Sequence, residues 1–192
     1  MINPDWKKEV FTIPNLLTLF RLLLIPVYVM IYMRATTMRD YVLAASILAV
    51  SCLTDLIDGK VARRFHMTST VGQILDPIAD KLTQLTLTLC LSIRYPVLQL
   101  VLGLFIIKEA FQCIAGLVHL QRGKMLPGAL MAGKICTTVL FVSLIILVLL
   151  PDLGTDVVRA IAWIDIALLL YAFVHYIGAY YGQKANLKDM TE

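Results

Sequence analysis

Charge is scarce in this chain. Of the 192 residues only 16% are charged, while 59% are hydrophobic, and the mean hydropathy is +0.82. This composition excludes an ordinary soluble domain and indicates a membrane protein with several spans. The net charge of +4 is dispersed without a run of Lys or Arg, which argues against a nucleic-acid partner and leaves membrane lipid as the anionic neighbour.

Cysteine is also rare, and its positions form no pattern. Each cysteine stands alone in an apolar stretch, with neither a C-x2-C pair nor the spacing of a metal site: Cys52, Cys90, Cys113 and Cys136. We therefore predict that all four pack in the core. A cleavable signal peptide is not expected, because acidic and basic residues mix before Phe11 and the apolar run that follows has spanning length.

Long apolar stretches predict an all-α integral membrane protein with six transmembrane helices in a single domain, residues 1–192. The predicted spans lie near residues 13–33, 41–61, 71–93, 97–120, 129–150 and 157–181. Residues 1–12 combine Trp6, Val10 and Phe11 with charged neighbours, which predicts a short helix in the membrane interface, with a frayed terminus as the alternative.

Loop charges predict the orientation of these spans. Nine cations fall on the side that carries both termini: Lys7, Lys8, Lys60, Arg63, Arg64, Arg122, Lys124, Lys184 and Lys188. Four fall on the other side: Arg34, Arg39, Arg94 and Arg159. Because cytoplasmic loops carry the excess of Lys and Arg, both termini are predicted to be cytoplasmic.

Four aspartates stand in the array D-x2-D-G-x2-A-R-x8-G-x3-D-x3-D, between Asp55 and Asp80. On helices, Asp55 stacks with Asp58 and Asp76 stacks with Asp80. The second and third spans are joined by a short loop, so we expect them to be antiparallel neighbours whose acids face one another. Acids within spans indicate function.

Carboxylate oxygens suit hard divalent cations, so the array predicts two Mg2+ ions, with Mn2+ also acceptable, and argues against zinc. Two such ions would hold a pyrophosphate. Gly59 allows close approach to the backbone, and Arg63 offers a donor fork for phosphate. The alternative is a buried ion-pair network of the acids with Lys81 and Arg63.

The array resembles the signature of the CDP-alcohol phosphotransferase family, membrane enzymes of phospholipid synthesis. All eight fixed positions match: Asp55, Asp58, Gly59, Ala62, Arg63, Gly72, Asp76 and Asp80. The resemblance implies a six-helix fold, usually homodimeric, with nucleotide and metals at the cytoplasmic end. It also implies that all four aspartates bind metal, that Asp80 acts as general base, and that CDP contacts Asp55, Gly59, Ala62, Arg63 and Gly72.

Two further segments resemble phosphatidylglycerolphosphate and cardiolipin synthases of this family. The first is N-x2-T-x2-R, formed by Asn15, Thr18 and Arg21, and the second is G-K-x2-T, which contains Lys134. We predict that Arg21, Lys108 and Lys134 bind the acceptor, with Asn15 and Thr18 as possible first-span contacts. The alternatives are that Asn15 and Thr18 cap a helix, that Arg21 pairs with one aspartate, and that Lys134 snorkels.

Lys108-Glu109 departs from the family pattern. Related enzymes typically carry Arg followed by an acid, and the glycerophosphate enzymes often continue with Ser-Gly-Leu-Arg, where this chain has Phe111-Gln112-Cys113-Ile114. Lys108 either binds an acceptor phosphate or pairs with an acid. Since adjacent helix residues point apart, a direct pair with Glu109 is not expected.

Asp165 and His175 match no motif, and we expect Asp165 near the outer boundary of the membrane. The tyrosines of the last span, Tyr171, Tyr176, Tyr180 and Tyr181, are interpreted as packing and an interfacial belt.

The predicted activity joins CDP-diacylglycerol to glycerol 3-phosphate in a bacterial plasma membrane, giving phosphatidylglycerol phosphate and CMP at the cytoplasmic side. Phosphatidylglycerol, with cardiolipin as product, or another alcohol is the alternative acceptor. A divalent-cation transporter is a rival from another class, disfavoured because the acids crowd one end of the bundle.

Overall fold

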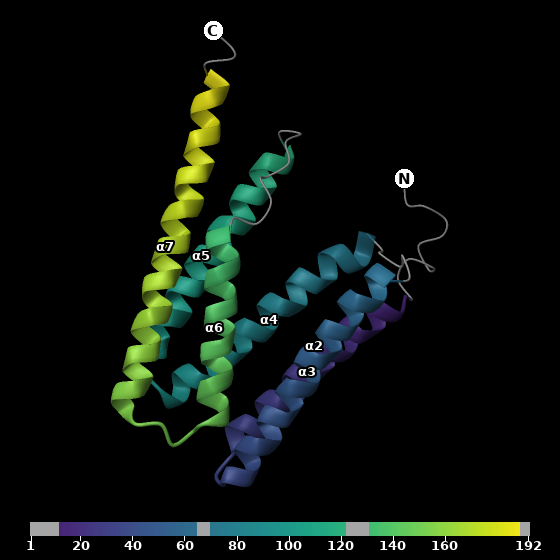
Figure 1. The fold of residues 1–192 in the computed structure, drawn as a ribbon, viewed down its shortest axis with the longest axis vertical. Coiled ribbons are helices and arrows are strands. Elements are labelled where there is room, and N and C mark those ends of the chain that lie inside the picture. Colours follow the sequence, from purple (N-terminus) through teal and green to yellow (C-terminus); the bar gives the residue numbers. More distant parts are fainter. Residues whose placement is uncertain (1–11, 65–69, 122–130, 189–192) are drawn as a thin grey trace. The chain divides into compact units, whose positions relative to one another are not determined.

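The computed structural model describes residues 12–64, 70–121 and 131–188, and for residues 13–14, 55–64, 70–71, 73–74, 117–121 and 180–188 it describes the backbone alone. The described residues form six α-helices and no strand (Figure 1). These are α2 (Ile13–Arg34), α3 (Met38–Arg64), α4 (Thr70–Arg94), α5 (Leu98–Gln121), α6 (Met131–Leu149) and α7 (Thr155–Lys188). Residues 1–11 of the predicted interfacial segment lie outside the described ranges.

The six helices coincide with the six predicted spans to within a few residues, apart from the longer C-terminal end of α7, and the all-α membrane fold is confirmed. Within the described ranges, four segments are long and apolar enough to cross a membrane: Asn15–Arg34, Leu98–Gly116, Met131–Leu149 and Thr155–Ala179. Asp76, Asp80 and Lys81 keep α4 out of this group.

Large apolar side chains cover the outside of the helices. Leu23 is 68% exposed, Met131 70% and Val174 66%, and many others on all six helices are similarly open. A water-soluble protein rarely exposes so much contiguous apolar surface. Lipid tails solvate such side chains without cost, so this surface is that of a membrane protein.

A proline and a set of side-chain hydrogen bonds explain where α2 and α3 begin. Pro14 occupies the first turn of α2, where its missing N–H is not needed. At the start of α3, one carboxylate oxygen of Asp40 accepts hydrogen bonds from the Thr36 N–H at 3.0 Å, the Thr37 N–H at 2.8 Å and the Thr37 hydroxyl at 2.9 Å. These donors, the Thr36 N–H first, lower the pKa of Asp40, because they stabilise its charged form.

The chain forms two compact units, each with its own packing. The first contains the described residues up to Cys90 together with Val148–Pro151, and the second contains the described residues of Leu91–Leu147 and those from Asp152 onward. In the first unit α2 and α3 run side by side in opposite directions (Figure 1), around buried Tyr28, Ala44 and Leu48. In the second, α5 packs on α7, where Phe111 meets Phe173 edge to face at 5.3 Å.

The cysteine prediction is only partly correct. Cys90 and Cys136 are buried as predicted, whereas Cys52 is half-buried and Cys113 is exposed. Inside a membrane an apolar side chain gains little by leaving lipid, so apolar character alone does not identify the core.

Candidate functional site

One face of α2 carries three polar residues at a spacing of three. Asn15 is 2% exposed, Thr18 is fully buried, and Arg21 is 2% exposed. The neighbouring Leu16 and Phe20 point outward instead, at 48% and 45% exposure. The helical repeat therefore turns the polar row toward the protein, as the sequence predicts for a common face.

The polar row of α2 meets the second half of the aspartate array. The Thr18 hydroxyl donates to Asp76 Oδ1 at 2.6 Å, and Arg21 Nη1 donates to Asp80 Oδ1 at 2.5 Å. Asp76 and Asp80 lie one turn apart on α4, so residues from two successive turns of α2 donate hydrogen bonds to residues from two successive turns of α4. Arg21 thus pairs with one aspartate, which is one of the two alternatives that the sequence predicts for it.

The ion pair is asymmetric in its exposure. The Arg21 side chain is 3% exposed, whereas the Asp80 side chain is 52% exposed. A buried guanidinium is fixed in place by its surroundings, while the carboxylate it binds remains accessible from the other side. Such an arrangement orients an acid and leaves it open to a ligand.

Gly72 is buried and lies one turn before Asp76 on α4, in the same helical row. The first half of the array, Asp55, Asp58, Gly59, Ala62 and Arg63, lies on the last turns of α3. The side chains of these five residues lie outside the described part of the chain, so their roles in metal and CDP binding stay predictions.

The described acids fit a divalent cation chemically. Asp76 and Asp80 offer oxygen ligands from one face of one helix, the donor type that Mg2+ and Mn2+ prefer. Among residues with described side chains, no group of three acids, histidines or cysteines forms a complete site. A full ligand set therefore requires further donors, and the α3 acids are the predicted ones.

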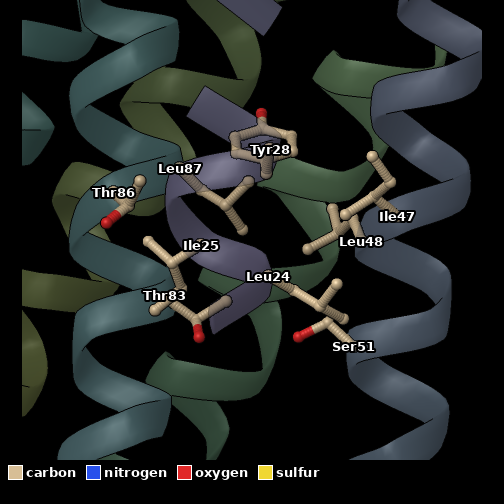
Figure 2. A pocket seen from close by; sticks show the side chains of 9 residues that line it. All are labelled: Leu24, Ile25, Tyr28, Ile47, Leu48, Ser51, Thr83, Thr86 and Leu87. Atoms are coloured by element: carbon tan, nitrogen blue, oxygen red, sulfur yellow. The ribbon is translucent and has the colours of Figure 1, made fainter. Parts of the chain in front are cut away.

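Beyond Arg21, α2 borders a small apolar cavity of the first unit (Figure 2). It is lined by side chains from α2, α3 and α4: Leu24, Ile25, Tyr28, Ile47, Leu48, Ser51, Thr83, Thr86 and Leu87. Figure 2 shows the Tyr28 hydroxyl directed away from those of Ser51 and Thr83. The cavity has room for about one water molecule, which makes it a packing gap and not a substrate site.

Lys108 lies in the second unit and is 2% exposed. Its Nζ donates to Glu109 Oε1 at 2.7 Å, so the expectation that these neighbours do not pair is wrong. Their Cβ atoms do diverge on the helix, but the four-carbon stem of lysine is long enough to bend back to the adjacent carboxylate. The pair neutralises a cation in the middle of an apolar helix.

Lys134 lies near the start of α6 and is exposed. The hydroxyls of Thr137 and Thr138 donate to backbone carbonyls one turn earlier, at 2.9 Å to Gly133 and 2.9 Å to Lys134 respectively. The threonines of the G-K-x2-T segment thus bond to their own helix, and the lysine is the accessible group.

Sequence reasoning missed two polar contacts of the second unit. The Ser143 hydroxyl donates to Asp165 Oδ1 at 3.0 Å, and Asp165 is 1% exposed and lies about 15 Å along α7 from Thr155. Tyr176, interpreted as belt or packing, lies close to both Lys108 and Gly133. A lone acid in an apolar run was the available signal for Asp165, and Tyr176 had none.

His175 is exposed, and its ring meets Tyr171 edge to face at 5.1 Å. Both side chains lie on the outer surface of α7, since Tyr171 is 56% exposed. The structure gives neither residue a place among the predicted site residues.

Comparison with known proteins identifies a family that matches most of the chain. The family model for CDP-alcohol phosphatidyltransferase matches residues 11–171. CDP-diacylglycerol--glycerol-3-phosphate 3-phosphatidyltransferases of Shigella flexneri and Escherichia coli K12 are 31% and 30% identical, over 93% of this chain and 98% of each relative.

A third relative is a fission yeast fusion protein, from Schizosaccharomyces pombe, named as cardiolipin synthase (CMP-forming) and mitochondrial hydrolase. It is 38% identical over 127 residues, which are 66% of this chain and 20% of the fusion protein. The family match covers all six helices at least in part, including both halves of the aspartate array. The chain belongs to the CDP-alcohol phosphatidyltransferase family of membrane enzymes.

Proposed function

We propose that this enzyme transfers the phosphatidyl group of CDP-diacylglycerol to glycerol 3-phosphate and releases CMP. The observation that carries the proposal is the pairing of the α2 polar row with Asp76 and Asp80, which joins the first-span segment to the family signature. The bacterial relatives that align over 93% of the chain are named for this reaction.

The proposed step is a displacement at phosphorus. A hydroxyl oxygen of the acceptor bonds to the phosphorus that carries diacylglycerol, the bond from that phosphorus to the CMP oxygen breaks, and the hydroxyl proton passes to the Asp80 carboxylate. Asp80 suits this role because its side chain is half exposed while Arg21 holds one of its oxygens. Positioning contributes most to such phosphoryl transfers.

Thr18 and Arg21 act on the acids and not on the reacting phosphorus. The Thr18 hydroxyl fixes the rotation of the Asp76 carboxylate, and Arg21 does the same for Asp80. Partners of this kind behind metal-binding carboxylates commonly govern both affinity and alignment.

Mg2+ is the proposed cofactor, as two ions, with Mn2+ as a substitute. Asp55, Asp58, Asp76 and Asp80 would hold the ions, which neutralise charge on the diphosphate when bound. The oxygen-only donor set of Asp76 and Asp80 supports this choice over zinc.

The proposed acceptor ligands stay those predicted from the sequence: Arg21, Lys108 and Lys134. Glycerol 3-phosphate carries a phosphate, and an exposed lysine at a helix start offers it a point charge. The active site and both termini are placed at the cytoplasmic side of a bacterial plasma membrane, as the loop charges favour. A homodimer is proposed from the family resemblance.

Phosphatidylglycerol is the second candidate acceptor. The 38% identity to the segment of the fission yeast fusion protein favours it. The reaction would be the same displacement, with a free hydroxyl of the phosphatidylglycerol headgroup as nucleophile and cardiolipin as product.

An acceptor panel tests the proposal directly. Purified protein in detergent is given CDP-diacylglycerol and Mg2+, with glycerol 3-phosphate, phosphatidylglycerol or glycerol, and CMP release is measured. The expected result is release with glycerol 3-phosphate and none with glycerol. Release with phosphatidylglycerol alone would overturn the first choice and support the second, and no CMP with any acceptor would refute the transferase reading.

A further inference from the structure

The Lys108 ammonium is held by two neighbours in the second unit. Glu109 accepts a hydrogen bond from it at 2.7 Å, and the ring of Tyr176 lies with its centroid 5.8 Å from Nζ. A cation within about 6 Å of an aromatic face is attracted by the ring's electron density, more strongly where water is excluded. Lys108 is 2% exposed, so its position depends on these contacts.

Tyr176 in turn is seated against α6 at Gly133. A Cβ atom on Gly133 would meet the Tyr176 hydroxyl oxygen first, and would lie 2.8 Å from Cε2 and 2.9 Å from Cζ of the ring, closer than real side chains approach. No residue larger than glycine therefore fits at position 133 while the ring stays where it is. The glycine is needed for this close approach, since its backbone is ordinary helix.

The Tyr176 ring of α7 thus lies beside one predicted acceptor ligand and against the residue next to another. It faces the Lys108 ammonium of α5, and it rests on the residue that precedes Lys134 in α6. Phe111 and Phe173 pack edge to face at 5.3 Å on the same pair of helices, which fixes α5 against α7 beside the tyrosine. Displacing the ring would therefore change the surroundings of both Lys108 and Gly133.

We propose that Tyr176 is a positioning residue of the acceptor site, which holds the Lys108 ammonium for the phosphate of the acceptor and requires Gly133 to do so. The inference rests on the proposed function, because it deepens the assignment of Lys108 to the acceptor. The aromatic ring, and not the hydroxyl, carries the role. The contact of Tyr176 with Lys108 affects acceptor binding and does not affect binding of CDP-diacylglycerol.

The test compares Tyr176→Leu, Tyr176→Phe and Tyr171→Leu in the purified full chain. The leucine at 176 removes the ring and is expected to raise KM for glycerol 3-phosphate about 3- to 30-fold, with KM for CDP-diacylglycerol unchanged. The phenylalanine keeps the ring and should restore KM to within about threefold of wild type. Tyr171 is exposed on the same helix, so Y171L is the matched control and should match wild type.

Gly133→Ala gives a second variant in case Y176L does not fold. Its added methyl group pushes the ring away without removing it, so it should also raise KM for glycerol 3-phosphate. Combined with Y176L it should add nothing further, because the ring it displaces is gone. Equal changes in both KM values, or a Y176F defect as large as that of Y176L, would overturn the inference.

The same measurements separate the inference from the proposed function. Wild-type protein that releases CMP with glycerol 3-phosphate, together with a Y176L variant of unchanged KM, would overturn the role of Tyr176 alone. Wild-type protein that releases no CMP with glycerol 3-phosphate would overturn the proposed acceptor, and the inference with it.

Discussion

Replacing Thr18 with valine removes the hydroxyl that α2 gives to Asp76. The Thr18 hydroxyl lies 2.6 Å from Asp76 Oδ1, and Thr18 is fully buried. Valine has nearly the same shape, so T18V takes away one donor without leaving a large cavity. Asp76 then loses the hydrogen bond that fixes the rotation of its carboxylate.

The size of the effect follows from the kind of bond. Hydrogen bonds to a charged group contribute about 1.5–3 kcal/mol, and little of this is recovered from solvent when the donor is buried. At about 1.4 kcal/mol for each factor of ten, the loss corresponds to roughly 10- to 100-fold. Mutations of groups behind metal ligands typically weaken metal affinity or activity by about the same factor.

The assay is the Mg2+ concentration that gives half-maximal CMP release at saturating substrates. T18V is expected to raise it about 10- to 100-fold, and thermal stabilisation of the substrate-free protein by Mg2+ should move to higher concentration in parallel. Thr88→Val is the matched control, because Thr88 is equally buried on α4 but donates to the Gln84 carbonyl of its own helix at 2.7 Å. If T18V and T88V have the same Mg2+ dependence as wild type, Thr18 does not orient a metal ligand.

Four other outcomes are expected. Asp80→Asn should lower CMP release by about 10²- to 10⁴-fold while CDP binding measured by calorimetry persists, and unchanged turnover would remove Asp80 from the mechanism. Ser143→Ala should destabilise the protein by about 1–3 kcal/mol in thermal unfolding, because it leaves buried Asp165 without its donor. Asp165→Asn keeps an acceptor for Ser143 and removes the acid, so it should not destabilise, and a drop as large as that of S143A would contradict this account. Because the pKa of Asp40 is lowered in the folded protein, the stabilisation that its hydrogen bonds give the start of α3 is fully present above the ordinary aspartate pKa of about 3.9. This stabilisation is lost as the pH falls through the lower pKa of the folded protein. Protection of the Thr36 and Thr37 amide hydrogens, measured against the intrinsic exchange rate at each pH, should therefore fall in acid, but not in an Asp40→Asn variant.

The helices were predictable because length and apolar character decide them. Each apolar run of about 20 residues must satisfy its backbone hydrogen bonds internally, so hydropathy located all six helices. The common face of Thr18 and Arg21 followed from the helical repeat alone, since a spacing of three places both on one side.

Which apolar residue faces protein and which faces lipid was not predictable in the same way. Cys113 and Cys136 stand in similar sequence surroundings, yet one is exposed and the other buried. Both environments are apolar, so composition carries no signal that separates them. The contact of Gly133 with Tyr176 joins two helices, so it depends on tertiary packing that cannot be read from the sequence. The bend of Lys108 toward Glu109 depends on a side-chain conformation that sequence spacing does not specify.

The pairing of Arg21 with Asp80 has a consequence for how the protein is made. An aspartate near the centre of a helix disfavours insertion from the translocon by about 2.5–3.5 kcal/mol. Because α2 precedes α4 in the chain, we expect its guanidinium to be in the bilayer when the acid of α4 arrives. We therefore expect an earlier segment of the same polypeptide to assist biogenesis of the acidic helix.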